Sequence, residues 1–161
     1  MEGIGTVNVG ELLEYNKVVR LRYFECFTRL SWQQFIENRE ASFGSIRNIF
    51  LHALGAADYW LDFLQKEKLF SRREYDDYRT FQEVKDYMEH VETRLHKYLS
   101  LHSAGLQEKY IVKSEEKDAI IVTAEDVLIH IFEEEVHHRG EIIALLWQIG
   151  VEPPPMEWKE L

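Results

Sequence analysis

The feature of this sequence that most constrains its fold is a helical spacing of apolar residues in four separate stretches. Apolar side chains return every three or four residues across residues 9–30, 45–66, 80–101 and 123–149. That spacing places them along one face of an α-helix, and each such face must be buried against another element. We therefore predict an all-α fold in which four long amphipathic helices pack as a four-helix bundle.

Residues that start and stop helices separate these stretches. Thr80 with Glu83, and Thr123 with Asp126, have the spacing of a capping box at the start of the third and fourth long helices. Gly150 follows the fourth helix, and three prolines behind it prevent the helix from continuing. Local backbone chemistry thus marks the same boundaries as the periodicity.

Two shorter segments between the helices have patterns of their own. Ser31, with Gln34 three residues later, predicts a short helix after the first long one. Residues 105–123 form the longest connection and hold two β-branched or aromatic runs around a polar turn. We expect a small hairpin or an extended crossover connection there, before the last helix. No repeat or linker divides the chain, so residues 1–161 are predicted to form a single domain.

The charge balance limits the classes of partner. Lys and Arg number 19 and Asp and Glu number 29, which gives a formal net charge of −10. Such an acidic surface repels phosphate backbones and anionic lipids. We therefore expect neither nucleic acid nor a membrane as a partner.

Cysteine content and hydropathy indicate the compartment. The single cysteine, Cys26, cannot form an internal disulfide and is predicted to be a small apolar residue of the core. The N-terminal segment lacks the pattern of a signal peptide, and the longest apolar run, residues 142–147, is too short to span a bilayer. We expect a cytoplasmic protein.

The stretch HIFEEEVHHRGEI, which starts at His130, places three consecutive carboxylates before two histidines. On a helix that turns about 100° per residue, with His130 at zero, the apolar side chains occupy an arc from about 60° to 160°. His138 and Glu135 fall inside that arc and Glu134 lies on its edge, whereas His130 and His137 lie outside it. Carboxylate and imidazole groups are therefore expected to face the interior one turn apart, unlike a solvated charge cluster.

This arrangement is suited to a metal site. Glu134 and His138, at i and i+4, can direct both side chains at one point, and Glu135 with His138 is the alternative pair. A third ligand is needed, and His52 lies at the border of the apolar face of the second long helix. His52, Glu134 and His138 would form a two-histidine, one-carboxylate set with open positions. The competing interpretation is a group of ordinary polar residues, and a ferritin-like di-iron centre is disfavoured because Glu-x-x-His occurs on one helix only.

Two blocks of the sequence resemble the DinB-like (YfiT-like) family of metal-binding four-helix bundles. SFGSIRNIFLHALGAADYWLDFL, residues 42–64, resembles the second helix of the family, in which a histidine precedes small residues and a tryptophan. TAEDVLIHIFEEEVHHRGEIIALLWQIGVEPP, residues 123–154, resembles its last helix and tail. HRGE at 138–141 is the most specific piece. The resemblance covers nearly the whole chain.

The resemblance implies a metal site of three histidines, one on the second helix and two in H-x-x-x-H on the last. His52 and His138 match this pattern, but the first histidine of H-x-x-x-H falls on Glu134. A carboxylate oxygen binds zinc at distances close to those of imidazole nitrogen. It also adds negative charge and favours harder ions such as Mn²⁺ or Fe²⁺. Zn, Ni, Mn and Fe are the divalent ions expected, with either Glu134 as third ligand or a degenerate site.

The resemblance also implies candidate functions. Characterised relatives include thiol-dependent transferases and isomerases that bind a low-molecular-weight thiol as its thiolate. A thiol S-transferase that acts on small electrophiles is the first hypothesis. The alternatives are a non-catalytic metal-binding or stress-related dimeric bundle and a metal-dependent hydrolase. A small-molecule substrate and a homodimer are the expected partners.

Other residues of these helices receive structural interpretations. Glu135, if buried, needs a partner, which either a ligating histidine or Arg139 can supply. Glu141, His130 and His137 are predicted to lie on the outer face of the last helix. The large aromatic residues of the two helices are predicted to belong to the core and not to a substrate pocket: Tyr59, Trp60 and Trp147.

Overall fold

The computed structural model describes residues 8–66, 73–113 and 119–157 of the 161-residue chain. Within these ranges the protein is mostly helical, as predicted, with five α-helices, one 3₁₀ turn and one pair of strands. In chain order the elements are α1 (Val9–Phe27), α2 (Trp32–Ile36), α3 (Ile46–Gln65), the 3₁₀ turn η1 (Tyr75–Asp77), α4 (Phe81–His102), β1 (Lys109–Val112), β2 (Ile120–Thr123) and α5 (Ala124–Gln148).

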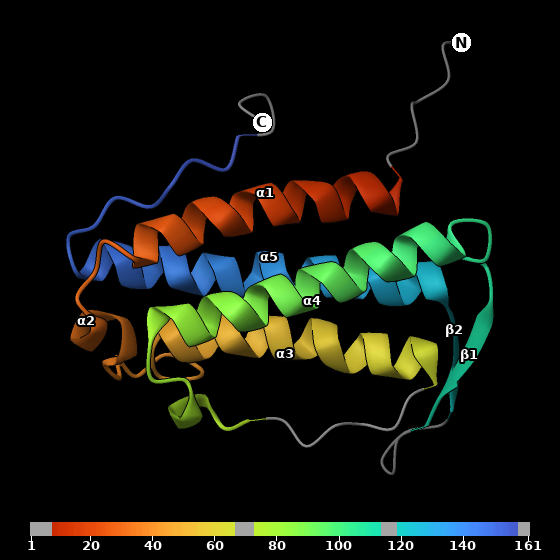
Figure 1. Ribbon diagram of the computed structural model, residues 1–161, viewed down its shortest axis with the longest axis horizontal. Coiled ribbons are helices and arrows are strands. Elements are labelled where there is room, and N and C mark those ends of the chain that lie inside the picture. The colour runs from red at the N-terminus through yellow and green to blue at the C-terminus, as the bar shows by residue number, and fades with distance from the viewer. Residues whose placement is uncertain (1–7, 67–72, 114–118, 158–161) are drawn as a thin grey trace.

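Four of the helices are long and lie side by side (Figure 1). Helix α3 contacts both α4 and α5, and α1 contacts the same two helices from the other side. The short helix α2 packs on α3, and the hairpin of β1 and β2 lies at one end of the long helices (Figure 1). Helices α3 and α5, which carry the predicted metal ligands, are therefore direct neighbours.

The predicted helix starts are confirmed by side-chain caps. Thr123 and Asp126 form a capping box at the start of α5, and Ser31 with Gln34 forms another at the start of α2. At α4 the Thr80 side chain accepts a bond from the backbone N–H of Glu83, as predicted. These caps satisfy backbone N–H groups that would otherwise lack a partner at the start of each helix.

The connection before α5 contains the predicted hairpin. Strands β1 and β2 are antiparallel, with Tyr110 opposite Val122. The side chain of Tyr110 is buried and its ring packs against Phe63 of α3, with 5.6 Å between ring centroids. The polar turn predicted between the strands falls largely on residues 114–118, which lie outside the described residues.

A continuous apolar core fills the space between the helices. Phe27 lies at its centre, with ring centroids 5.3 Å from those of both Phe35 and Phe50. Cys26 is 6% exposed, which confirms its prediction as a core residue, and burial raises the pKa of its thiol. Burial on this scale is the main favourable term in the stability of the fold.

Two expectations about the helices need correction. The first helix was predicted to reach residue 30 but ends at Phe27, because the N–H groups of Arg29 and Leu30 bond to carbonyls three residues earlier and tighten the chain into a turn. Trp147 was predicted to be in the core but is 58% exposed at the end of α5. Among the described helices, none is long and apolar enough to cross a membrane.

Candidate metal centre

Helices α3 and α5 bring the three predicted ligands together. His52 projects from α3, and Glu134 and His138 project from successive turns of α5. His138 is only 5% exposed, while the side chains of His52 and Glu134 are 31% and 29% exposed. The helical-wheel assignment is thus confirmed for burial: His138 lies in the interior, and the other two lie at its edge.

The distances suit a metal ion. Glu134 Oε2 lies 3.5 Å from His138 Nε2 and 3.9 Å from His52 Nε2. One ligand atom from each of the three residues lies within 4.8 Å of the others. Ligand atoms about 2.0–2.1 Å from a tetrahedral zinc ion are about 3.4 Å apart. Side-chain movements of less than an ångström would therefore bring all three donors into coordination range, so the donor set fits a divalent ion.

Both imidazole rings are anchored through the nitrogen that faces away from Glu134. His138 Nδ1 is 2.7 Å from Glu141 Oε2, and His52 Nδ1 is 3.3 Å from the hydroxyl of Tyr75. A proton on Nδ1 that is donated to a carboxylate or hydroxyl oxygen leaves the lone pair of Nε2 for a metal. The Glu141 carboxylate thus favours the tautomer of His138 that the predicted site requires, whereas the Tyr75 hydroxyl, which can donate or accept, orients the ring of His52.

The position of Glu141 corrects the sequence prediction. Glu141 was expected on the outer face, but its side chain bonds to the buried ring of His138. The reason is geometric: side chains on a helix lean towards its N-terminus, so a carboxylate at i+3 reaches back over residue i. Burial tends to raise the pKa of Glu141, but hydrogen bonds from His138 and Ser42 outweigh this and hold the pKa below its ordinary value.

Phe43 completes the wall behind the histidines. Its ring stacks on His52 with 3.8 Å between centroids and an interplanar angle of 18°. The same ring meets the edge of His138 at 5.5 Å. Phe43 lies in the connection between α2 and α3, where periodicity gives no signal, and the sequence prediction missed it. Its contacts help to hold both rings in place.

A second group of possible ligands shares residues with the first. His137, His138 and Glu141 also offer ligand atoms within 4.8 Å of one another. All three come from α5, however, and His137 is exposed, as predicted. Glu141 and His138 Nδ1 are at hydrogen-bonding distance. In this second group Glu141 therefore orients the ring of His138 through a hydrogen bond. The first group, which joins α3 and α5, is the better metal site.

Glu135 takes part in a buried ion-pair network instead of contacting a ligating histidine. Arg20 of α1 donates from Nη2 to Glu135 Oε2 at 2.6 Å and from Nε to Glu135 Oε1 at 3.0 Å. Arg139, the partner proposed from the sequence, donates to Glu135 Oε1 at 3.4 Å and to Asn16 Oδ1 at 2.7 Å. Burial would lower the pKa of Arg20, but Glu135 and Glu92 outweigh it and raise that pKa.

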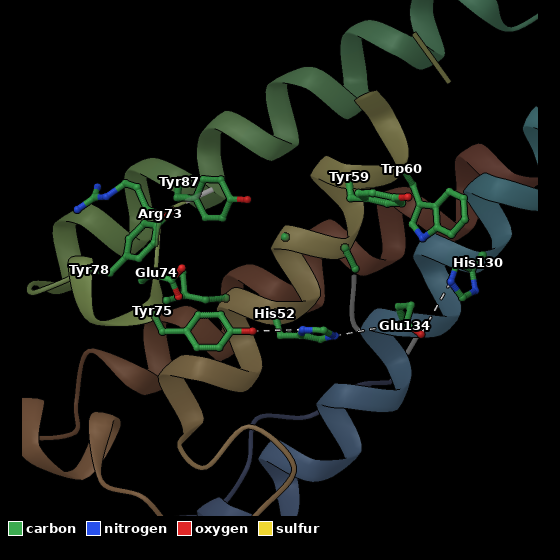
Figure 2. A pocket seen from close by; sticks show the side chains of 13 residues that line it. His52, Tyr59, Trp60, Arg73, Glu74, Tyr75, Tyr78, Tyr87, His130 and Glu134 are labelled. Carbon is green, nitrogen blue, oxygen red and sulfur yellow. Dashed lines mark hydrogen bonds and ion pairs between the residues drawn. The ribbon is translucent and has the colours of Figure 1, made fainter. Parts of the chain in front are cut away.

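A pocket of about 450 Å³ opens beside the site (Figure 2). His52 and Glu134 line it, while His138 lies behind them and does not. Tyr59 and Trp60 also line it, which corrects the prediction that they lie away from a pocket: Tyr59 is 39% exposed, while Trp60 is half-buried and packs against the core as predicted. Because the triad lies at the border of an interhelical pocket, a small molecule could reach two of the three ligands.

His130 lies outside the apolar face, as predicted, but it also lines this pocket, which was not predicted. Its Nε2 lies 3.9 Å from Glu134 Oε1, and its ring meets that of Trp60 edge-on at 5.4 Å (Figure 2). The side chain stays 43% exposed. The helical wheel considers α5 alone, so it could not show that Trp60 of the neighbouring helix α3 packs against His130.

Solved structures similar to this chain share its arrangement of helices. A DinB-like protein from Bacillus cereus ATCC 10987 matches with a TM-score of 0.66 and 16% identity, over 89% of this chain and 91% of that one. A DinB-like protein of Bacillus subtilis, YjoA, matches with a TM-score of 0.62 and 16% identity, over 91% of this chain and 97% of that one. At such identities the likeness concerns the fold.

The sequence comparisons agree. The uncharacterized protein YizA of Bacillus subtilis (strain 168) is 22% identical over 143 residues, which cover 89% of this chain and 89% of that protein. The model of the DinB family matches residues 5–160. The resemblance found in the sequence is thereby confirmed, and the chain belongs to the DinB family.

Proposed function

We propose that the protein binds a divalent metal ion through His52, Glu134 and His138. One observation carries this proposal: the Nε2 atoms of two histidines lie 3.9 and 3.5 Å from the same carboxylate oxygen, Glu134 Oε2. His138 is buried and the side chains of His52 and Glu134 are 31% and 29% exposed, so a divalent ion would give these converging, partly desolvated groups a common partner. Zn, Ni, Mn and Fe remain the candidate ions, and the carboxylate favours the harder ones.

For catalysis we propose thiol S-transfer to a small electrophile. A bound divalent ion would lower the pKa of a low-molecular-weight thiol and favour its thiolate. The aromatic lining of the pocket would hold the electrophile against His52 and Glu134. The thiolate sulfur would form a bond to carbon while a carbon–halogen bond breaks and halide leaves. With an epoxide, a carbon–oxygen bond breaks and the oxygen takes a proton from water.

The test is thiol-dependent loss of an aryl chloride, followed by absorbance, with metal-loaded protein and several common thiols. The proposal expects turnover that is abolished in His138→Ala and retained in Glu133→Gln, a matched change at an exposed position of α5. Absence of turnover with every thiol, from protein that binds metal, would contradict the transferase and leave a non-catalytic metal-binding protein.

A metal-dependent hydrolase is the second candidate, and His130 favours it. Its Nε2 lies in the pocket 3.9 Å from Glu134 Oε1, where an imidazole could accept a proton from an attacking water. Turnover of substrate without added thiol would support hydrolysis over thiol transfer. The disappearance of that turnover in His130→Ala would assign the proton acceptor.

We also infer the organisation of the helices, the compartment and the partners of the protein. The four long helices would form one four-helix-bundle domain over residues 1–161, and the protein would be a cytoplasmic homodimer with a small-molecule substrate. The family resemblance supports the bundle and the homodimer, and the sequence composition supports the compartment. Sedimentation equilibrium would test the homodimer: a mass near 19.2 kDa would contradict it.

A further inference from the structure

The pocket beside the metal centre has walls made largely of aromatic rings. Tyr59 and Trp60 come from α3, Tyr75 and Tyr78 from the segment around η1, and Tyr87 from α4 (Figure 2). Between these walls α3 presents the small residues Gly55 and Ala56, with Leu51 and His52 about one turn earlier. The pocket therefore has room for a flat or compact body over α3, with aromatic rings around it. Such rings attract apolar groups and, through their faces, cations.

Carboxylate groups outnumber guanidinium groups in the lining of the pocket. Carboxylates line it at Glu134, beside His52, and at Glu74, in the segment that precedes η1 (Figure 2). The one guanidinium that lines it, in the described part of the chain, belongs to Arg73, and it is paired with Glu83 at 3.2 Å. Arg73 also lies over the ring of Tyr78, 4.3 Å from its centroid. A wall residue of the pocket thus already holds a planar cation on its face.

We propose that the pocket selects a small organic cation, an amine with an apolar or aromatic body, over an anion with the same body. The inference rests on the proposed function, because the ligand would be either a thiol or a substrate of the same site that carries an amine group. A divalent ion held by Glu134 would leave that end of the pocket positive. The ammonium group of the ligand is therefore directed to the Glu74 end, with the body over Gly55 and Ala56. The net charge of −10 would attract cations to the protein as a whole.

The test compares three probes with the same phenyl group and different charges: phenethylamine, phenethyl alcohol and phenylacetate. Each is titrated into the wild-type protein by calorimetry, with and without bound zinc. The expected result is that phenethylamine binds at least tenfold more tightly than phenylacetate in the metal-free protein. The difference should shrink as salt is raised, since charge sets it. Equal or tighter binding of phenylacetate without metal would overturn the proposal.

Two variants separate the charge from the rings. Glu74→Gln should weaken phenethylamine about three- to fivefold and leave phenethyl alcohol unchanged. Trp60→Leu should weaken both ligands about three- to tenfold, because it removes a face that stacks and attracts cations. Glu133→Gln removes a carboxylate from an exposed position of α5 that does not line the pocket, and should change neither ligand. Phenethylamine binding that survives both pocket changes would also overturn the proposal.

The His138→Ala variant distinguishes failure of this inference from failure of the metal site. His138 does not line the pocket, so its loss should abolish metal binding and leave metal-free binding of phenethylamine intact. Wild-type protein that binds the amine but no metal would contradict the proposed function alone. Protein that binds metal, but whose metal-free form does not discriminate between amine and carboxylate, would contradict this inference alone. Circular dichroism of each variant confirms that it is folded.

Discussion

The ring of His138 is held from both sides by carboxylates of its own helix. Glu141 contacts Nδ1 at 2.7 Å, and Glu134 lies 3.5 Å from Nε2. The two carboxylates have different roles, because only the second shares its oxygen with His52. Glu141 fixes the tautomer and direction of the ring, while Glu134 supplies the oxygen for the ion.

Loss of Glu141 should therefore weaken metal binding without removing a ligand. We expect Glu141→Ala to lower zinc affinity about 10- to 100-fold, as for other residues that orient a ligating histidine. Glu141→Gln should lose less, since its amide oxygen can still accept the Nδ1 proton. Competition with a chromogenic chelator measures both, with Glu133→Ala as the exposed control. Equal affinity in Glu141→Ala and wild type would show that the hydrogen bond has no role.

At the scale of the elements, α1 is joined to α5 by charges in the interior. Arg20 is 3% exposed and pairs with Glu135 of α5 and Glu92 of α4, both at 2.6 Å. Removal of one partner from a buried pair leaves the other charge without compensation. The network thus fixes the rotation of α5 and with it the direction of His138.

We expect Arg20→Ala to lower the free energy of unfolding by about 3 kcal/mol, the lower end of the range for a broken buried pair, because Glu135 would keep only its 3.4 Å contact with Arg139 and Glu92 would lose its 2.6 Å partner. Lys85 of α4 pairs only with the exposed Glu89 of its own helix among the described residues, at 3.5 Å, so Lys85→Ala should cost less than about 1 kcal/mol. Urea unfolding followed by circular dichroism measures both. A similar small change in both variants would contradict the structural role of the network.

The cap of α5 predicts a pH dependence. The Asp126 carboxylate accepts bonds from the backbone N–H and the hydroxyl of Thr123, which lower its pKa. A carboxyl group whose pKa is lower in the folded state stabilises the fold above its unfolded pKa, about 3.9, and this contribution is lost as pH falls through the folded pKa. The stability difference between wild type and Asp126→Asn should therefore shrink below about pH 4. A difference that stays constant from neutral to acidic pH would contradict this.

At the scale of the whole molecule, the metal ligands join two long helices that otherwise meet through apolar contacts. An ion bound only by the folded state stabilises it, by about 2.7 kcal/mol at a free concentration one hundred times the dissociation constant. We expect zinc to raise the melting temperature of wild-type protein and a chelator to reverse this. His138→Ala should show no such rise. A melting temperature that is unaffected by every candidate ion would contradict a shared site between α3 and α5.

The structural features that the sequence predicted share a physical origin. Caps and helical periodicity act locally, so the helix ends at Thr123 and the inward direction of His138 follow from a few residues. Phe43 and Tyr75, which contact His52, come from connections without periodicity. Their positions depend on how separate elements pack, and no local pattern encodes that. The position of His52 already suggested a cavity between helices, but the aromatic lining of the pocket comes from α3, the segment around η1 and α4, and it was missed for the same reason.

The most direct test of the central claim is the metal content of the purified protein and of its His52→Ala, Glu134→Ala and His138→Ala variants, after reconstitution with Zn²⁺, Mn²⁺ or Fe²⁺. The mixed triad predicts one ion per chain in the wild type and in Glu133→Ala, and a loss in each of the three variants. Full metal content in Glu134→Ala, or no metal in the wild type with any of these ions, would contradict it.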